Sequence, residues 1–174
     1  CGVVSFTLGM LSCRILTCTC GTFTMAKYAP PSIWTDEFNA PSVDGLRKFV
    51  INDAKKAFDK AKTKILALEN VHVEVKWYGD CWFWVVAFIS NFTDEPLAIM
   101  ITAEENLQIA SPLTHEFIEQ LSTRRLKRFV RDGLELAMPP HRTSWAVWSI
   151  PTPSAVEDVM PVLKSKQKFY TPVE

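Results

Sequence analysis

The sequence predicts an α+β domain in which helices pack on a mostly antiparallel sheet of about four or five strands. Apolar residues recur at three- and four-residue spacing from Leu46 to Leu68, which is typical of an amphipathic helix. Apolar and polar residues alternate from Val71 to Tyr78, and short apolar runs separated by turn residues follow. The expected order of elements is α-β-β-β-(β)-α-α-β-α, and we assign the domain to residues 42–170.

The size and composition of the chain suit one such domain. It has 174 residues, of which 48% are hydrophobic, and a chain of this length buries roughly 70% of the surface that its unfolded form exposes. Lys and Arg total 19 and Asp and Glu total 19, so the formal net charge is zero. A nucleic-acid binder needs a large field of one sign, so nucleic acid is not the expected partner.

The first helix has a recognisable start. The side-chain oxygen of Ser42 or Asp44 can accept the free amide protons of a first helical turn, so either residue can begin it. Lysines interrupted by acidic residues occupy the face opposite its apolar stripe, and we interpret that face as a solvated surface. Asn70 is the expected end of the helix.

Strands are expected next, at residues 71–78, 81–89, 97–102 and 107–110. Gly79-Asp80 forms the predicted turn between the first and the second. The segment 81–89 is almost continuously apolar and aromatic, so we expect a central strand that is covered on both faces. Cys81 at its start is then a small buried hydrophobic residue.

Two short helices are predicted after these strands. Thr114 can begin the first of them. Ser122 or Thr123 can begin the second, and Pro139-Pro140 stops it because proline disfavours a helical residue before it.

The chain should end in a strand at 145–150 and a last helix. Ser154 and Glu157 stand at the spacing of a capping box, in which each side chain satisfies the backbone amide of the other residue. Pro161 lies too deep for a first-turn proline if Ser154 is the cap. The helix therefore either kinks at Pro161 or begins near Asp158.

Residues 1–24 differ in composition from the rest of the chain. They contain one basic residue, Arg14, and no acidic residue, whereas Met25 begins a stretch that resembles an ordinary cytosolic start. We expect 1–24 to be a leader or upstream sequence and 25–41 to be a Pro-rich arm. A signal peptide is the alternative, because Gly2 to Leu11 is an apolar run of suitable length. We predict a cytoplasmic protein with no transmembrane segment, or a secreted one if 1–24 is a signal peptide.

Aromatic residues are concentrated around the turn at 77–84. Aromatic side chains at alternating strand positions fill a core, or they line a groove for a flat apolar ligand where one sheet face is left free. Both alternatives stay open. The charged residues near the turn, Glu74, Lys76 and Asp80, are either the polar groups of such a groove or part of a solvated strand edge. The candidate ligand-binding residues are Glu74, Lys76, Trp77, Tyr78, Asp80, Trp82, Trp84, Trp145 and Trp148.

A second candidate site is a basic run on the predicted second short helix. Arginine offers a forked set of donors that matches phosphate oxygens, so these residues can bind an anion. Acidic residues one helical turn further on make ordinary pairing on a solvated helix face the alternative. The candidate anion-binding residues are Arg124, Arg125, Arg128 and Arg131.

Candidates for catalysis are few. His141-Arg142 follows a proline pair and precedes an aromatic strand, which suits an active-site loop, whereas His72 and His115 suit the surface. Short enzyme signatures such as GxSxG, a P-loop, GxGxxG before a helix and HExxH do not occur. No CxxC pair with a histidine partner occurs either, and we predict no metal site and no cofactor.

The segment from Val73 to Phe169 resembles the YdhG-like group of small domains of unknown function. The resemblance rests on the turn Trp77-Tyr78-Gly79-Asp80, the strand Trp145-Ala-Val-Trp148, and a last helix carrying Asp158-Val159 and Leu163-Lys164-Ser165-Lys166. Some members are described as similar to frataxin-type iron chaperones, which implies an α/β sandwich with an acidic ridge on the first helix. The first helix here is rich in lysine, whereas ferrous iron needs clustered oxygen ligands, so no site residue is carried over.

The favoured hypothesis is a module that binds a small molecule or a protein through its aromatic sheet region and catalyses nothing. An enzyme of unrecognised class is the first alternative, with a site built from histidine, arginine and carboxylate side chains. A protein that handles phosphate, nucleic acid or metal is the second. The sequence predicts no oligomeric state.

Overall fold

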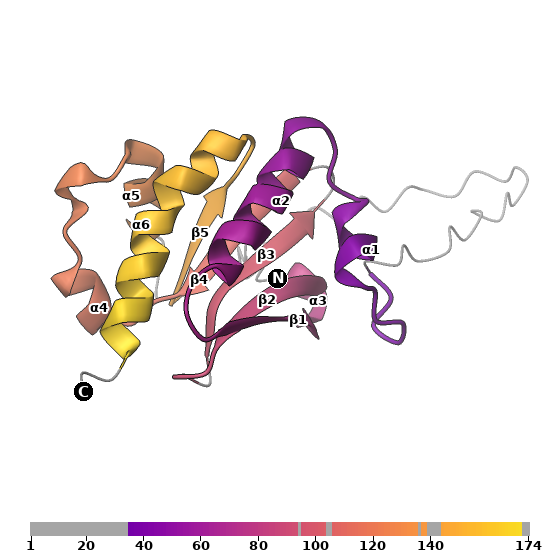
Figure 1. The fold of residues 1–174 in the computed structure, drawn as a ribbon, viewed down its shortest axis with the longest axis horizontal. Coiled ribbons are helices and arrows are strands. Elements are labelled where there is room, and N and C mark those ends of the chain that lie inside the picture. Colours follow the sequence, from indigo (N-terminus) through magenta and orange to yellow (C-terminus); the bar gives the residue numbers. More distant parts are fainter. Residues whose placement is uncertain (1–34, 94, 104–105, 136, 139–143, 172–174) are drawn as a thin grey trace, which may run out of the picture. The chain divides into compact units, whose positions relative to one another are not determined.

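A computed structural model describes residues 35–171, apart from 94, 104–105, 136 and 139–143. Its centre is a five-stranded sheet in the order β1-β2-β3-β4-β5, in which each strand runs antiparallel to its neighbours (Figure 1). The strands are β1 (Val71–Trp77), β2 (Trp84–Ser90), β3 (Pro96–Ala103), β4 (Asn106–Pro112) and β5 (Trp145–Ser149). The predicted α+β class is confirmed, and the order of elements agrees in outline. The predictions for 1–24, for most of the arm 25–41, and for Pro139-Pro140 lie outside the described residues.

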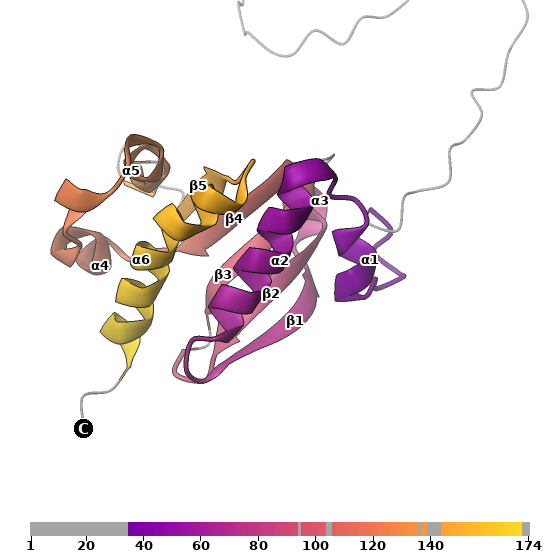
Figure 2. The same ribbon diagram turned by 45° about the horizontal axis from the view of Figure 1, so that its top comes forward.

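The helices are α1 (Val43–Arg47), α2 (Asn52–Leu66), α3 (Gly79–Trp82), α4 (His115–Gln120), α5 (Arg128–Glu135) and α6 (Pro153–Tyr170). A 3-10 turn at Thr123–Arg125 stands between α4 and α5. Both ribbon views show α2 and α6 side by side across one face of the sheet (Figures 1 and 2). All described residues belong to one compact unit of the chain, Pro31–Glu174. In the part of the chain that the structure describes, no helix is both long and apolar enough to cross a bilayer.

The helix predicted over 46–68 is in fact two helices. Ser42 caps α1 as expected, since its hydroxyl accepts a hydrogen bond of 3.0 Å from the Gly45 amide. The chain then turns at Asn52, whose φ of 53° lies in the left-handed region that asparagine tolerates better than most residues. Apolar residues keep a three- to four-residue spacing across this turn, so the spacing alone could not show the break.

The connection between β1 and β2 also differs from the prediction. Gly79 to Trp82 forms one helical turn, and Phe83 follows with a φ of 53° before β2 begins at Trp84. The Tyr78 amide donates a hydrogen bond of 2.9 Å to the Phe83 carbonyl and so closes the connection. Cys81 is exposed on this turn, so its predicted burial is wrong.

The beginnings of α5 and α6 correct two further predictions. The Ser122 side chain makes no capping bond, and α5 begins later, at Arg128. The capping box is also wrong, because the Ser154 hydroxyl pairs with the Thr152 hydroxyl at 3.0 Å and Glu157 pairs with lysines of α2. Helix α6 begins with a proline in its first turn and continues through Pro161, so a start near Asp158 is wrong as well.

Apolar side chains fill both faces of the sheet. Phe58, Phe88 and Trp148 belong to the larger layer, between the helices and the sheet. A smaller layer lies on the opposite face and is centred on five residues, Val85, Ala87, Ile99, Ile101 and Ala110. Strand β2 is buried on both faces, as predicted for a central strand.

Candidate functional site

The sheet divides the predicted aromatic site into two groups. Trp77 and Trp84 pack edge-on at 5.5 Å between ring centroids and belong to the layer under the helices. Trp148 belongs to the same layer and is 1% exposed. Tyr78, Trp82 and Trp145 lie on the opposite face. The candidates therefore do not form one groove.

The group on the opposite face, Tyr78, Trp82 and Trp145, is a tight aromatic cluster. The ring centroids of Trp82 and Trp145 lie 4.8 Å apart, and Tyr78 is 6.1 Å from Trp82 and 6.0 Å from Trp145. These separations and the steep angles between the rings are those of favourable edge-to-face contacts. Burial raises the pKa of the Tyr78 hydroxyl, and the charge of Glu95 raises it further. We interpret this cluster as packing that joins the β1–β2 connection to the start of β5.

The charged candidates near the turn are all exposed. The Glu74 carboxylate lies 3.1 Å from Lys76 Nζ and 3.3 Å from His72 Nε2 on the outward side of β1. The hydrogen bond from Lys76 is the main cause of a lowered Glu74 pKa, and His72 adds to the effect. Asp80 is exposed on α3. The contacts described for Glu74 fit the predicted alternative of a solvated strand edge.

The candidate arginines do not converge on one described anion site. Arg124 and Arg125 are exposed on the 3-10 turn, and Arg131 is exposed on α5. Arg128 Nε lies 3.9 Å from Asp132 Oδ2 on the surface of α5. The catalytic candidates His141 and Arg142 lie outside the described residues.

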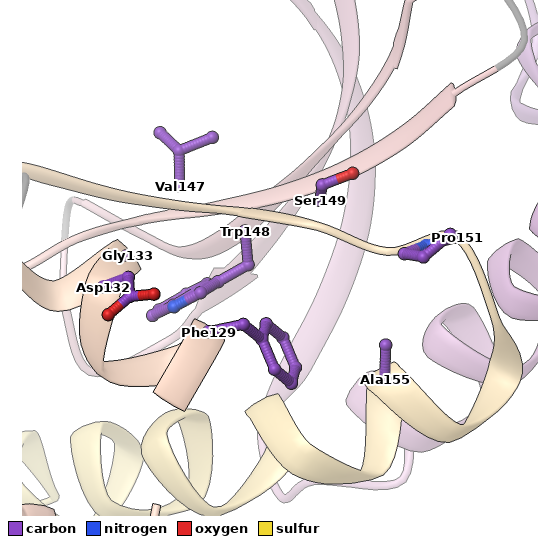
Figure 3. A pocket seen from close by; sticks show the side chains of 8 residues that line it. All are labelled: Phe129, Asp132, Gly133, Val147, Trp148, Ser149, Pro151 and Ala155. Atoms are coloured by element: carbon purple, nitrogen blue, oxygen red, sulfur yellow. The ribbon is translucent and has the colours of Figure 1, made fainter. Parts of the chain in front are cut away.

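A pocket of about 560 Å³ lies where β5 meets α5 and the first turn of α6. Figure 3 shows the Trp148 indole extending between the side chains of Asp132 and Phe129, both from α5. Pro151 and Ala155 line the side that is formed by α6 and the loop before it. The remaining lining residues are Gly133, Val147 and Ser149. Of the predicted ligand-binding residues, only Trp148 lines this pocket.

A close approach of α5 to β5 fixes the position of Trp148. Its indole Nε1 donates a hydrogen bond of 2.9 Å to the Val130 carbonyl of α5. Gly133 permits the approach, since a Cβ added there would lie 2.3 Å from both Cδ1 and Nε1 of the indole and 2.8 Å from the Val147 carbonyl oxygen. The indole is therefore a rigid wall of the pocket, because its polar atom is satisfied and its ring is held by the backbone of α5.

Sequence analysis missed most of this pocket. In the sequence, Phe129 stands in an apolar stripe of helical spacing and Asp132 four residues after Arg128, so each residue alone fits an ordinary amphipathic helix. Ala155 is separated from both by more than a complete strand. The one local signal was Gly133 in the middle of a predicted helix, where glycine costs about 1 kcal/mol relative to alanine and so indicates a close packing contact.

The polar groups of the pocket limit its chemistry. Among the described residues that line it, one is acidic, Asp132, and one carries a hydroxyl, Ser149, and none is a histidine, cysteine or lysine. In the described part of the chain, no three His, Cys, Asp or Glu residues are grouped so that they could hold a metal ion. The arrangement suits reversible binding of an apolar molecule that carries few polar groups.

The chain matches no protein-family model, no curated protein and no solved structure. The resemblance to YdhG-like domains therefore stays a prediction.

Proposed function

We propose that this protein is a binding module that holds a small, flat and mainly apolar ligand in the pocket against Trp148. The observation that carries the proposal is the pocket itself, with a volume of about 560 Å³ and described lining residues that are apolar except for Asp132 and Ser149. Sites for small molecules in proteins have volumes of about 300–1,000 Å³ and combine apolar walls with a few polar groups.

The rigidity of the Trp148 indole supports the proposal. Trp148 is 1% exposed and held in place, so it supports the pocket from beneath and need not be ordered when a ligand binds. Phe129 is partly exposed and offers the ligand an aromatic surface in the same pocket. Aromatic ligands stack or pack edge-on against such rings and gain about 0.5–1.5 kcal/mol beyond the burial of apolar area.

The residues that line the pocket favour binding without catalysis. General acid–base catalysis at neutral pH usually needs a histidine or another group of suitable pKa, and nucleophilic catalysis needs an activated side chain. Among the described lining residues, neither Asp132 nor Ser149 has a histidine or lysine beside it.

The experiment that tests the proposal is a titration of the full chain with 2-naphthalenemethanol, a flat neutral probe. We expect a change in tryptophan emission and a rise in melting temperature, because a ligand that binds only the folded state stabilises it. At a concentration of 100 Kd the gain is about 2.7 kcal/mol. Ala155→Leu should weaken binding at least tenfold, because the larger side chain fills the pocket.

Ser165→Leu is the matched control, since it makes a similar change at an exposed position of α6 outside the lining. It should bind the probe as the unaltered chain does. If the unaltered chain shows no saturable response, or if both variants respond alike, this pocket is not a binding site.

A further inference from the structure

We infer that the ligand of this pocket is a cation, an arylalkylamine by chemical class, whose ring packs on the partly exposed Phe129 and whose ammonium group faces Asp132. The inference rests on the proposed function and assigns the chemical class of its ligand.

The first support is the charge of the lining. Among the described residues that line the pocket, Asp132 is the one with an ionisable side chain, and that side chain is 59% exposed. Its nearest described cation is Arg128, whose Nε lies 3.9 Å from Oδ2 and whose side chain is 89% exposed. An ion pair so long and so exposed is weak, so a ligand cation can compete for the carboxylate.

The second support comes from the aromatic walls. The faces of Trp and Phe rings carry negative electrostatic potential and attract a cation within about 6 Å of the ring centre. Phe129 and Trp148 line the pocket together with Asp132 (Figure 3). The carboxylate of Asp132 and the partly exposed ring of Phe129 therefore both favour a cation in this pocket.

The third support is the outer edge of β5. The Ile150 amide donates a hydrogen bond of 2.8 Å to the Leu107 carbonyl, and Trp148 is paired with Ile109. Peptide groups alternate along an antiparallel strand, so the N–H and C=O of Ser149 point away from β4. Because Ser149 lines the pocket, its carbonyl offers an ammonium group a second acceptor.

The basic residues nearby do not oppose the inference. None of them belongs to the described lining of the pocket, although α5 carries Arg128 and Arg131. Lys127 is held by Asp158 of α6 in an ion pair of 2.9 Å. The side chains of Arg128 and Lys127 are exposed, so solvent and salt screen their effect on a ligand in the pocket.

The test compares three probes that share one ring system: 2-naphthylmethylamine, 2-naphthalenemethanol and 2-naphthoic acid. We expect the amine to bind the full chain at pH 7 at least threefold more tightly than the alcohol, and the acid to bind most weakly. Raising the salt concentration should narrow the difference between amine and alcohol.

Asp132→Asn should remove the advantage of the amine over the alcohol. Glu135→Gln is the matched control, because it removes the same charge from an exposed position of the same helix outside the lining, and it should keep that advantage. Equal binding of amine and alcohol, or tighter binding of the acid, overturns this inference and leaves the proposed function standing. Binding of none of the probes overturns the proposed function and this inference with it.

Discussion

The ammonium group of Lys166 lies 3.1 Å from the Ser111 hydroxyl, in the interior of the domain between α6 and the sheet. Lys166 Nζ also donates hydrogen bonds to the carbonyls of Pro96, at 2.9 Å, and Leu97, at 3.1 Å. The residue is 2% exposed and pairs with no carboxylate among the described residues. Three acceptors satisfy the ammonium group, but its charge is buried without a counter-ion.

The burial of Lys166 predicts that stability rises between pH 7 and pH 9.5. Desolvation lowers the pKa of Lys166 from 10.5 to about 7, against a smaller opposing effect of Glu95. In this window the unfolded chain binds the extra proton and the folded chain does not, so raising the pH favours the folded state by up to about 1.4 kcal/mol per unit. Urea denaturation of the full chain at several pH values measures this slope.

Lys166→Met provides the matching variant, since it keeps the length of the side chain and removes the titrating group. We expect its free energy of unfolding to be nearly independent of pH from 7 to 9.5. The measurement stops at pH 9.5 because the raised pKa of Tyr78 acts in the opposite direction at higher pH. The same slope in the variant as in the unaltered chain would contradict the assignment to Lys166.

The two-residue alternation of apolar and polar residues, together with the turn residues between the apolar runs, was sufficient to predict the sheet. The alternation from Val71 to Trp77 places successive side chains on opposite faces, and the structure follows that pattern along the whole of β1. The turns that interrupt a helix at Asn52 and a strand at Phe83 could not be predicted from these patterns. Asn52 and Phe83 adopt left-handed conformations that only tertiary packing selects, and the apolar patterns around them are the same with or without the turn.

The buried lysine and the pocket were harder to predict from the sequence than the fold. Lys166 stands in the polar run Lys164-Ser165-Lys166 and resembles a surface lysine, yet the direction of α6 turns it inward. Trp148 was one of several tryptophans with two possible roles, and the sheet gives them different surroundings. A pocket formed by elements distant in sequence leaves no local pattern, because each wall also satisfies the rules of its own helix or strand.

Gly133→Ala should destabilise the domain although alanine is the better helix former. The added Cβ would meet the Trp148 indole at 2.3 Å, and overpacking of this kind costs about 1–3 kcal/mol. The gain in helix propensity, about 1 kcal/mol, offsets only part of that cost. Gly45→Ala is the control, because its Cβ would meet Ser42 Oγ at an ordinary 3.4 Å. Denaturant midpoints should fall for the first variant and stay level or rise for the second.

Glu157 should make the packing of α6 on α2 sensitive to acid. Its carboxylate lies 2.7 Å from both Lys60 and Lys64, and the hydrogen bonds from these lysines lower its pKa to about 2. Between pH 4.5 and pH 2 the unfolded chain binds the extra proton, so this contribution to stability is lost as the pH falls through that window. Glu157→Gln should flatten this part of the stability profile.

Asp53→Asn serves as the control for Glu157, because the ion pair described for Asp53 is with Lys56 of the same helix, on an exposed surface. Its profile between pH 4.5 and pH 2 should keep the slope of the unaltered chain. An equal flattening in both variants would show that the loss is a general effect of charge and not of the contact between α2 and α6.

The contact between Trp82 and Trp145 should be measurable as a coupling energy. Their ring centroids lie 4.8 Å apart at an interplanar angle of 77°, and they join α3 to β5 on the face of the sheet opposite the helices. We expect a double-mutant cycle of Trp82→Ala and Trp145→Ala to give a coupling of about 0.5–1.5 kcal/mol in free energy of unfolding. The cycle isolates the pair because losses that involve only one of the two rings cancel.

A parallel cycle of Trp82 with Trp148, which lies in the other apolar layer, should be additive to within about 0.5 kcal/mol. Equal coupling in the two cycles would mean that truncating Trp82 disturbs the whole sheet, and the cluster would then not be the element that holds the β1–β2 connection against β5.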